Sequence, residues 1–321
     1  MTIFITGVAG FIGCRLAGEL LKRGERVAGF DNLCRGSLQN LNTVRDHPNF
    51  TFSAIDLADL DAYRKALRSV HAQEPVSEIW HMAANSDIPA GVSDPNVDFR
   101  DTFLTTFNSL ILMKELGIGI MAFASSSAVY GDLGNEVLTE DIGPLFPISN
   151  YGAMKLASEA AISAALESYL QNAFVFRFPN VIGVPATHGV IQDFIRKLKA
   201  TPGNLDVLGD GTQQKSYLHV DDLIDALLYI RNEAHDRLNY FNVAGNDDGV
   251  TVKFIAEAVV SRVAPGATIT FGQGNRGWVG DVPKFKYSTL KLSSLGWRPR
   301  LSSVQAIEKA VNEIAEQEFG R

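Results

Sequence analysis

The sequence predicts an α/β protein with a Rossmann-type doubly wound parallel sheet, followed by a smaller C-terminal α/β lobe. Two observations support this prediction. Apolar, β-branched runs alternate with helical patterns up to about residue 178, and a glycine-spaced turn, Gly7 to Gly13, joins the first run to the first helical pattern. Strands separated by helices of this length make right-handed crossovers, which produce a parallel sheet covered on both faces. Ligands of such sheets bind beyond the carboxyl ends of the strands.

The expected elements of the first lobe follow this alternation in chain order. The strands are short apolar runs at Ile3–Thr6, Arg26–Asp31, Thr51–Ile55, Glu78–His81, Ile120–Ser125 and Ala173–Arg177. The helices between them have longer helical patterns, at Phe11–Arg23, Leu60–His71, Thr102–Leu116 and Tyr151–Gln171.

After Pro179 the alternation weakens. A helix near 221–232 and a strand near 240–243 are expected to return to the main sheet. The first lobe is therefore predicted to comprise residues 1–178 with a return segment at about 219–245, and it would bind the cofactor. Residues 179–218 and 246–321 are predicted to form a substrate-binding lobe. The remaining expected elements of the chain are helices at 190–200, 252–263 and 303–318 and a strand at 268–271.

Composition limits the possible functions. The chain has 321 residues, of which 46% are hydrophobic, so material for a large core is ample. A formal net charge of −7 argues against a nucleic-acid surface, which needs clustered positive charge. No apolar run approaches membrane-spanning length, and the two cysteines, Cys14 and Cys34, have no metal-ligand spacing. We expect a soluble cytoplasmic protein with no membrane, nucleic-acid or metal partner.

The glycine-spaced turn is a candidate phosphate site. Glycine lets the backbone approach a phosphate closely, and the free N–H groups of the following helix then face the anion. Asp31 ends the second strand, eighteen residues after Gly13, where an acidic residue binds the adenosine ribose. A carboxylate there favours NAD over NADP, although the nearby Arg35 keeps NADP open. Asp31 is alternatively a plain turn residue. The same choice applies to Asp56-Leu57, which either touches the adenine or forms a turn.

Tyr151 and Lys155 are four residues apart, so on a helix they share one face. A free phenol has a pKa of about 10 and is a poor base at neutral pH. A neighbouring ammonium, with a positive nicotinamide close by, is expected to lower that pKa, so that the tyrosine takes a proton from a substrate hydroxyl. One serine of Ser125–Ser127, which follow a strand, can bind the reacting oxygen; the three are alternatively an ordinary polar loop.

Several further motifs accompany these residues: Asp31–Leu33, His81–Ala84, Ser125–Gly131, Arg177–Asn180, Gly209–Asp221 and Arg276–Pro283. Together with the glycine turn and the Tyr151–Lys155 pair, they cover nearly the whole chain. The sequence resembles an extended short-chain dehydrogenase/reductase of the nucleotide-sugar type, closest to UDP-glucose (UDP-galactose) 4-epimerases.

The resemblance implies a role for each matching position. Tyr151 would be the base, Lys155 the residue that lowers its pKa and binds the nicotinamide ribose, and Ser126 the hydrogen-bonding serine. The substrate would contact Ser126, and its diphosphate or nucleotide would meet Asn180, Lys215, Arg276 and Trp278. The positions implied for NAD binding are Gly7, Gly10, Phe11, Ile12, Gly13, Asp31, Asn32, Asp56, Leu57, Ala83, Ala84, Tyr151 and Lys155.

Departures from the family pattern narrow the chemistry. Dehydratases of this superfamily carry an Asp-Glu pair directly after the catalytic Ser or Thr, where this chain has Ser127-Ala128, so elimination of water is not expected. Thr102 stands where relatives usually have an asparagine, and Trp278 where many epimerases have an arginine. The segment 85–88, Asn-Ser-Asp-Ile, also differs from the best-known epimerases, which indicates a specialised sugar pocket.

The favoured function is NAD-dependent 4-epimerisation of a nucleotide-diphosphate sugar through a transient 4-keto intermediate. The alternative uses the same residues for net redox, as a nucleotide-sugar C4 dehydrogenase or ketoreductase. A third, less favoured possibility is a non-catalytic NAD-sensing regulator on the same fold. We also expect a homodimer, since the segments 102–116 and 151–171 are rich in apolar residues and suit a four-helix interface, although burial against the protein's own sheet explains much of the same pattern.

Overall fold

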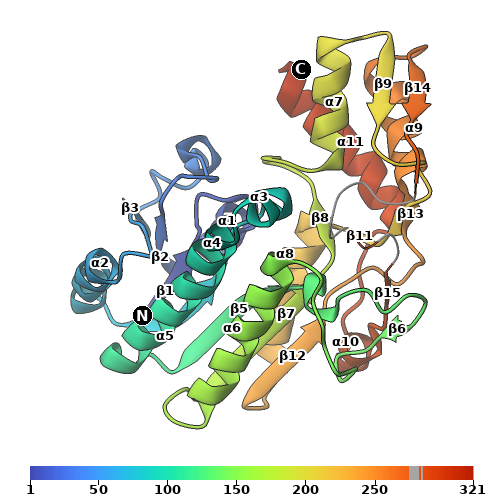
Figure 1. The fold of residues 1–321 in the computed structure, drawn as a ribbon. Coiled ribbons are helices and arrows are strands. Elements are labelled where there is room, and N and C mark those ends of the chain that lie inside the picture. The colour runs from blue at the N-terminus through green and yellow to red at the C-terminus, as the bar shows by residue number, and fades with distance from the viewer. Residues whose placement is uncertain (275–281, 283–284, 321) are drawn as a thin grey trace. The chain divides into compact units, whose positions relative to one another are not determined.

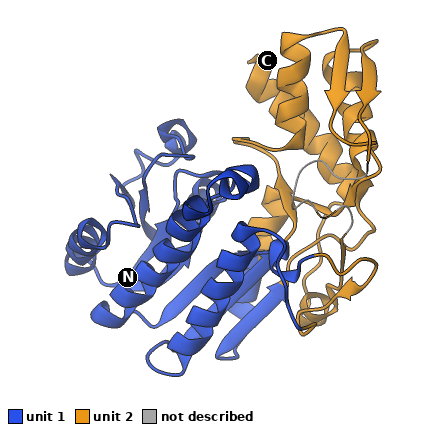
Figure 2. Ribbon diagram, in the orientation of Figure 1, with its two compact units in different colours: residues 1–131, 144–177, 227–241 blue, residues 132–143, 178–226, 242–321 orange. Residues whose placement is uncertain are grey.

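The computed structural model describes residues 1–274, 282 and 285–320. The chain forms two compact units (Figures 1 and 2). Unit 1 comprises residues 1–131, 144–177 and 227–241, and unit 2 comprises residues 132–143, 178–226 and 242–321. Among the described residues, no helix combines the length and the apolar character needed to cross a membrane.

A seven-stranded sheet organises unit 1 (Figure 1). Its strands, in spatial order, are β12 (Leu238–Asn242), β7 (Asn172–Phe178), β5 (Ile120–Ser126), β4 (Val76–His81), β1 (Thr2–Thr6), β2 (Arg26–Asp31) and β3 (Phe50–Ala54). The pairings from β5 across to β3 are all parallel. This order confirms the predicted doubly wound α/β fold, with the strand order reversing beside β1. Thr6 pairs with Phe30 and His81, so β1, β2 and β4 end at the same edge.

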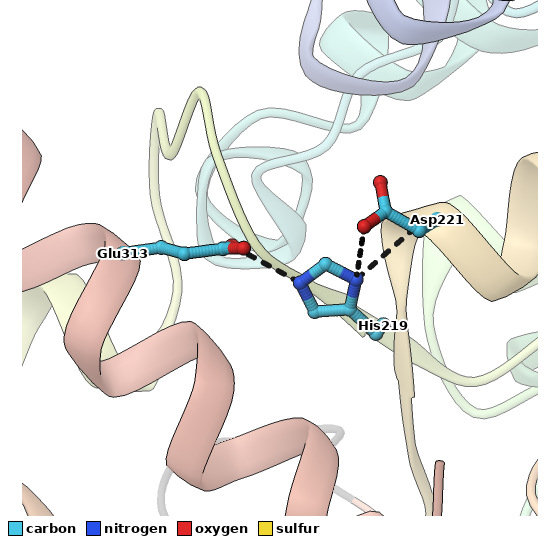
Figure 3. Close-up of side chains that lie close together, drawn as sticks. All are labelled: His219, Asp221 and Glu313. Carbon is cyan, nitrogen blue, oxygen red and sulfur yellow. Dashed lines mark hydrogen bonds and ion pairs between the residues drawn. The ribbon is translucent and has the colours of Figure 1, made fainter. Parts of the chain in front are cut away.

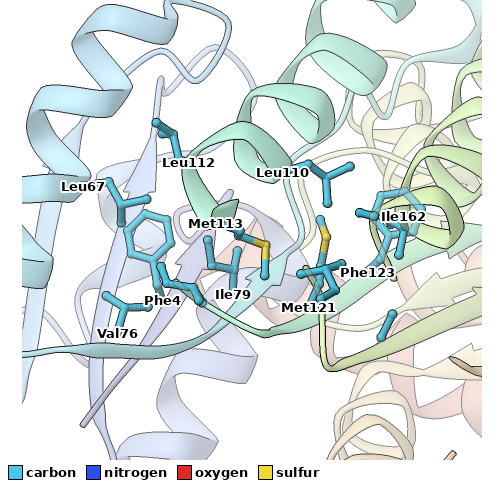
Figure 4. Close-up of a cluster of buried hydrophobic side chains, with 14 of the residues drawn as sticks. Phe4, Leu67, Val76, Ile79, Leu110, Leu112, Met113, Met121, Phe123 and Ile162 are labelled. Atoms are coloured by element: carbon cyan, nitrogen blue, oxygen red, sulfur yellow. The ribbon is translucent and has the colours of Figure 1, made fainter. Parts of the chain in front are cut away.

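Three helices cover one face of this sheet: α2 (Leu60–Gln73), α5 (Thr105–Leu116) and α6 (Asn150–Leu166). Figure 4 shows their apolar side chains meeting those of the strands. Phe4 and Ile79 from the sheet pack with Leu67, Met113 and other buried residues of the helices. Each such burial contributes about 1.5–3 kcal/mol, so this layer fixes the sheet on which the site is built. The helix α1 (Phe11–Lys22) packs against β1 and β2 with a separate set of buried residues.

The segment between β4 and α5 forms three short helical pieces, none of which the sequence pattern predicts as a separate element. It forms α3 (Ile88–Ser93), α4 (Pro95–Asp98) and a π-helical turn, η2 (Phe99–Leu104), before α5 begins. Asp87 and Asp94 cap α3 and α4, each of which has a proline in its first turn. The predicted helix over 102–116 therefore begins within the π-helical turn. The predicted helix over 151–171 ends earlier, at Leu166, where the N–H groups of Ser168, Tyr169 and Leu170 all donate to the carbonyl of Ala165.

Unit 2 is built around three helices, α7 (Val190–Ala200), α9 (Val252–Val263) and α11 (Ser303–Phe319), which share one apolar core. A capping box of Ser302 and Gln305 starts α11. A parallel pair, β9 (Asn204–Val207) with β14 (Thr268–Phe271), lies beside α7 and α9. The shorter pairs are β8 (Asn180–Ile182) with β11 (Tyr217–His219), β10 (Gln214–Lys215) with β13 (Val250–Thr251), and β6 (Val137–Leu138) with β15 (Lys286–Tyr287).

Two short 3₁₀ helices, η1 (Leu38–Leu41) and η3 (Ser127–Tyr130), and two further α-helices complete the described part of the chain. The helix α8 (Val220–Glu233) begins in unit 2 and ends in unit 1, and α10 (Leu290–Leu295) belongs to unit 2. The predicted helices over 190–200 and 252–263 have the bounds that the sequence pattern predicts. The predicted helix over 221–232, strand over 240–243, strand over 268–271 and helix over 303–318 are confirmed within two residues at each end.

Candidate active site

The glycine turn after β1 forms a tight cradle at the start of α1. Gly7 has a φ of +67°, and its N–H donates to the carbonyl of Phe30 at 2.8 Å. A Cβ at Gly13 would lie 2.2 Å from the carbonyl oxygen of Gly7, so any larger residue would push the turn apart. Gly10 is the N-cap residue of α1, and no side chain in the described part of the chain caps it. The first N–H groups of α1 are therefore directed toward an anion, which fits a dinucleotide diphosphate.

Asp31 organises this cradle. Its Oδ2 accepts a hydrogen bond from the N–H of Ala9 at 3.0 Å, and its Oδ1 accepts one from the N–H of Leu33 at 2.8 Å. Burial raises the pKa of this carboxyl, and the backbone bonds from Leu33, Ala9 and Gly10 act in the opposite direction. Asp31 is thus a turn residue, as one interpretation predicted. Each carboxylate oxygen keeps a second lone pair, so the ribose interpretation fits as well. Arg35 forms an ion pair with Asp87 at 3.1 Å.

The remaining predicted cofactor residues border the same edge of the sheet. Asn32 is exposed and its Oδ1 accepts from Cys34, while the N–H of Ala83 donates to Thr6 Oγ1 at 3.3 Å. Phe11 and Ile12 open α1, and Ala84 follows Ala83 in the loop after β4.

Asp56 and Leu57 are already committed to protein contacts. Asp56 Oδ1 accepts from the N–H of Ala58, and its Oδ2 pairs with Arg100. The side chain of Leu57 is buried in the core of unit 1, so any contact with an adenine would come from its backbone.

Tyr151 and Lys155 lie one turn apart in the first half of α6, and Ser126 lies at the carboxyl end of β5. A Cβ at Gly152 would lie 2.4 Å from the carbonyl oxygen of Ala128, so this glycine lets α6 approach the turn that follows Ser126. Lys155 Nζ donates to the carbonyl of Ala124 at 2.5 Å and lies 5.8 Å from the centroid of the Tyr151 ring. The structure thus brings the three predicted catalytic residues together within unit 1.

Burial shifts the pKa values of Tyr151 and Lys155 in the chain alone. Burial raises the pKa of Tyr151 to about 12, and the hydrogen-bonding neighbour Ser126 only partly opposes this. Burial lowers the pKa of Lys155 to about 7, although the nearby Glu159 and Asp98 favour its charged form. Burial in low dielectric disfavours both charges, so the phenol pKa lies above its usual value in the chain alone. The predicted lowering, which depends on a positive nicotinamide as well as on the ammonium, stays a prediction.

The sequence analysis did not predict a buried ion pair on the helix that carries Tyr151 and Lys155. Arg177, on β7, holds Glu159 of α6 at 2.6 Å, and both side chains are about one-tenth exposed or less. Ser125 donates to the same carboxylate, and Arg177 also donates to the hydroxyl of Tyr130 at 3.2 Å. This network fixes α6 to β5 and β7. A signal was present in the sequence, since Glu159 follows Lys155 by four residues on the same helix face.

His81 is a second buried group that the sequence did not explain. Its Nδ1 lies 2.9 Å from Thr6 Oγ1, and its Nε2 lies 3.2 Å from Thr106 Oγ1. Burial lowers the pKa of His81 to about 3, with a further contribution from the charge of Lys155, so the imidazole is neutral. His81 therefore ties β4 to β1 and α5 and does not transfer protons.

The residues predicted to bind substrate lie elsewhere in the chain. Asn180 begins β8 and is exposed, and Lys215 lies in β10, half-buried; both belong to unit 2. Arg276 and Trp278 lie outside the described residues.

Unit 2 also contains a compact cluster of His219, Asp221 and Glu313 (Figure 3). The Nε2 of His219 lies 3.0 Å from Glu313 Oε2, and its Nδ1 lies 3.3 Å from Asp221 Oδ2. Lys309 Nζ lies 2.6 Å from Asp221 and 3.7 Å from Glu313. Burial acts against the charged imidazole, but the two carboxylates outweigh it and raise the pKa of His219. Ion pairs with His219 and Lys309 thus engage both carboxylates of this cluster.

Fold and site together define a dinucleotide-dependent enzyme of the short-chain dehydrogenase/reductase type. The glycine cradle, the carboxylate after β2 and the Ser126, Tyr151, Lys155 set all lie in one unit. The chain belongs to the NAD dependent epimerase/dehydratase family, whose sequence pattern matches residues 3–262. It is an NAD-dependent enzyme of the extended short-chain dehydrogenase/reductase type.

Individual relatives are similar over almost their whole length. A UDP-glucose 4-epimerase from Lacticaseibacillus casei is 30% identical over 329 residues, which cover 96% of this chain and 94% of the relative. A crystal structure of a UDP-galactose 4-epimerase superposes with a TM-score of 0.86 at 32% identity, with 99% of each chain covered. The UDP-glucose 4-epimerase of Thermus thermophilus, solved in complex with NAD, superposes with a TM-score of 0.84 at 29% identity, covering 98% of this chain and 99% of that one.

Proposed function

We propose that this chain is an NAD-dependent 4-epimerase of a nucleotide-diphosphate sugar. The observation that carries the proposal is the arrangement of Tyr151 and Lys155 on α6 beside Ser126, at the carboxyl edge of the sheet that also presents the glycine cradle. This edge is where a doubly wound sheet binds its dinucleotide. The 4-epimerases among the relatives support the choice of reaction.

The cradle residues fit the dinucleotide. The N–H groups at the start of α1, with Gly7 and Gly13 beneath them, would hold its diphosphate, and Asp31 would hold the adenosine ribose. When bound, NAD supplies the acceptor and donor for the hydride at C4 of the sugar.

The chain's own residues move the proton. Tyr151 Oη takes the proton of the C4 hydroxyl, and the Ser126 hydroxyl steadies the same oxygen. The ammonium of Lys155, 5.8 Å from the phenol ring, favours the phenolate that this step needs. The 4-keto sugar would then present its opposite face, so that C4 is inverted when it regains its hydride on that face, and Tyr151 would return the proton to the C4 oxygen. In unit 2, Asn180 and Lys215 would contact the substrate diphosphate, Lys215 as a point charge.

The residues next to Ser126 argue against elimination of water. Ser127 is buried and Ala128 has no acidic group, so the two positions after Ser126 carry no acid to protonate a leaving hydroxyl. Glu159 is the carboxylate closest in sequence to the catalytic pair, and it is bound to Arg177.

The proposal is tested by mixing the purified holoprotein with UDP-, GDP- and CDP-hexoses without added cofactor. The expected product is the C4 epimer, formed over many turnovers without net NADH. A keto product, or a requirement for an external oxidant, would instead support the dehydrogenase alternative. Tyr151→Phe is expected to abolish turnover. Tyr169→Phe, which removes a hydroxyl that donates to the carbonyl of Leu110 on the same face of the sheet, is the matched control.

The proposed quaternary structure is a homodimer. Three aromatic rings stack along one side of η2 and α5: Phe99, Phe103 and Phe107, with centroids 6.2 Å and 5.9 Å apart. Phe99 and Phe107 are 49% and 45% exposed, an apolar stripe that suits a symmetric interface. Light scattering should give twice the chain mass for the wild type and a monomer for Phe107→Glu. A wild-type monomer at micromolar concentration would contradict the proposal.

A further inference from the structure

Asp98, at the end of α4, is a buried carboxylate that the mechanism above does not use. Its side chain is 0% exposed. Its Oδ1 accepts a hydrogen bond from Asn85 Nδ2 at 2.8 Å, while its Oδ2 has no hydrogen-bond partner among the described residues. Native proteins pair nearly all buried polar atoms, and an unpaired buried charge is costly. A carboxylate kept in this state therefore calls for a function.

The position of Asp98 ties it to the first turn of α6. Its Oδ2 occupies the space in front of Gly91, where a Cβ would lie 1.7 Å from that oxygen. The carbonyl of Gly91 accepts a hydrogen bond from Nδ2 of Asn150, the residue before Tyr151, at 2.9 Å. Asn85, which holds Oδ1, donates its own N–H to Thr102 Oγ1 at 3.1 Å. Two of the departures noted in the sequence, Thr102 and the segment 85–88, thus meet at Asn85, which also binds Asp98.

The other carboxylates whose charges act on Asp98 or on Lys155 have cationic partners of their own. Glu159 is held by Arg177, Asp87 by Arg35 and Asp101 by Arg100. His81 is neutral because burial depresses its pKa. Asp98 forms no ion pair within the described residues. Burial raises the pKa of its carboxyl, while the hydrogen bond from Asn85 and the charge of Lys155 act in the opposite direction. The carboxylate in turn acts on the charges of both Tyr151 and Lys155.

We propose that Asp98 is a positioning residue for the active site: its carboxylate is the counter-charge of the Lys155 ammonium, and through Gly91 and Asn150 it seats the first turn of α6. The kinetic consequences rest on the proposed function, whereas the charge interaction itself does not. A negative charge beside the pair favours the protonated form of both groups, since it opposes the phenolate and stabilises the ammonium.

Removal of this charge gives a distinctive result. In Asp98→Asn the phenol and the ammonium should both lose their protons more readily. Both limbs of the pH profile of kcat/KM should then move to lower pH together, by about one unit, the lower end of what a nearby charge produces. A residue with a purely structural role would change the folded fraction or the height of the profile and leave both midpoints in place.

The experiment titrates the holoprotein of the wild type, Asp98→Asn and Asp101→Asn, with the tyrosinate ultraviolet absorbance measured against Tyr151→Phe. Asp101→Asn is the matched control, because the same chemical change is made three residues away in a carboxylate held by Arg100. A lowered Tyr151 midpoint in Asp98→Asn alone supports the proposal. Equal midpoints in all three proteins, or equal shifts in both variants, overturn it.

A second variant keeps the test usable if Asp98→Asn does not fold. Asp98→Ser removes the same charge with a shorter polar side chain, so the Tyr151 midpoint should again fall. An unchanged midpoint in Asp98→Ser overturns the proposal. Failure of the proposed function is recognised separately, since the absorbance titration needs no sugar substrate and reports on Asp98 even in a protein that epimerises none of the hexoses.

Discussion

Replacement of Lys155 by methionine should lower kcat/KM about a hundredfold. The Nζ atom of Lys155 lies 5.8 Å from the centroid of the Tyr151 ring. At an effective dielectric constant of about 20, two unit charges at that distance interact by about 3 kcal/mol. This energy corresponds to about two units in the pKa of the phenol. The fraction of the tyrosine present as phenolate at a given pH would therefore change about a hundredfold. Methionine is unbranched and of similar length, so it should keep the packing against Phe123, whose ring centroid lies 4.7 Å from Nζ.

The assay follows interconversion of the C4 epimers of the nucleotide sugar identified by the substrate panel, at several pH values. Lys114→Met is a closely matched control, because Lys114 Nζ also lies 5.8 Å from a tyrosine ring, that of Tyr169, and contributes the same chemical change. The control should retain wild-type kcat/KM. If Lys155→Met folds and its kcat/KM stays within about threefold of the wild-type value, the reasoning is refuted, because the charge interaction between Lys155 and Tyr151 would then be absent.

Three further outcomes are expected. Gly13→Ala should weaken NAD binding about tenfold to a hundredfold, measured by calorimetry, because the added methyl would lie 2.2 Å from the carbonyl oxygen of Gly7. Arg177→Met should lower the free energy of unfolding in urea by about 3–5 kcal/mol, because it leaves the buried Glu159 without its cation. The raised pKa of His219 should add stability that is complete below the usual value of 6.5 and lost as pH rises through the folded value; His219→Gln should lack this decline.

The sheet and the larger helices could be predicted because their signals are local. The runs at β1, β2 and β4 are buried on both faces of a parallel sheet, and such strands are nearly continuous in apolar residues. The helix α7 carries a strong apolar periodicity and begins after a glycine, and α9 begins after a capping threonine. The two-residue strands of unit 2 have no such signal, since their pairing depends on segments far apart in the chain.

The candidate site was predictable only in part. The spacing of Tyr151 and Lys155 and the serine that follows a strand can be read directly from the amino-acid sequence. The Arg177–Glu159 pair and the buried Asp98 depend on which side chains meet in the core, and no periodic pattern reports that. Gly152, a glycine in the first turn of a helix, was an overlooked sign of close helix packing.

The protonation of the catalytic pair links base activation to cofactor binding. The pKa values of Tyr151 and Lys155 in the chain alone, about 12 and about 7, lie in the reverse order of what proton abstraction at neutral pH requires. Burial causes both shifts, so further exclusion of water by substrate would not correct them. An additional positive charge near the phenol would, and oxidised nicotinamide carries one. The tyrosine should therefore become a competent base only while oxidised NAD is held in the glycine cradle.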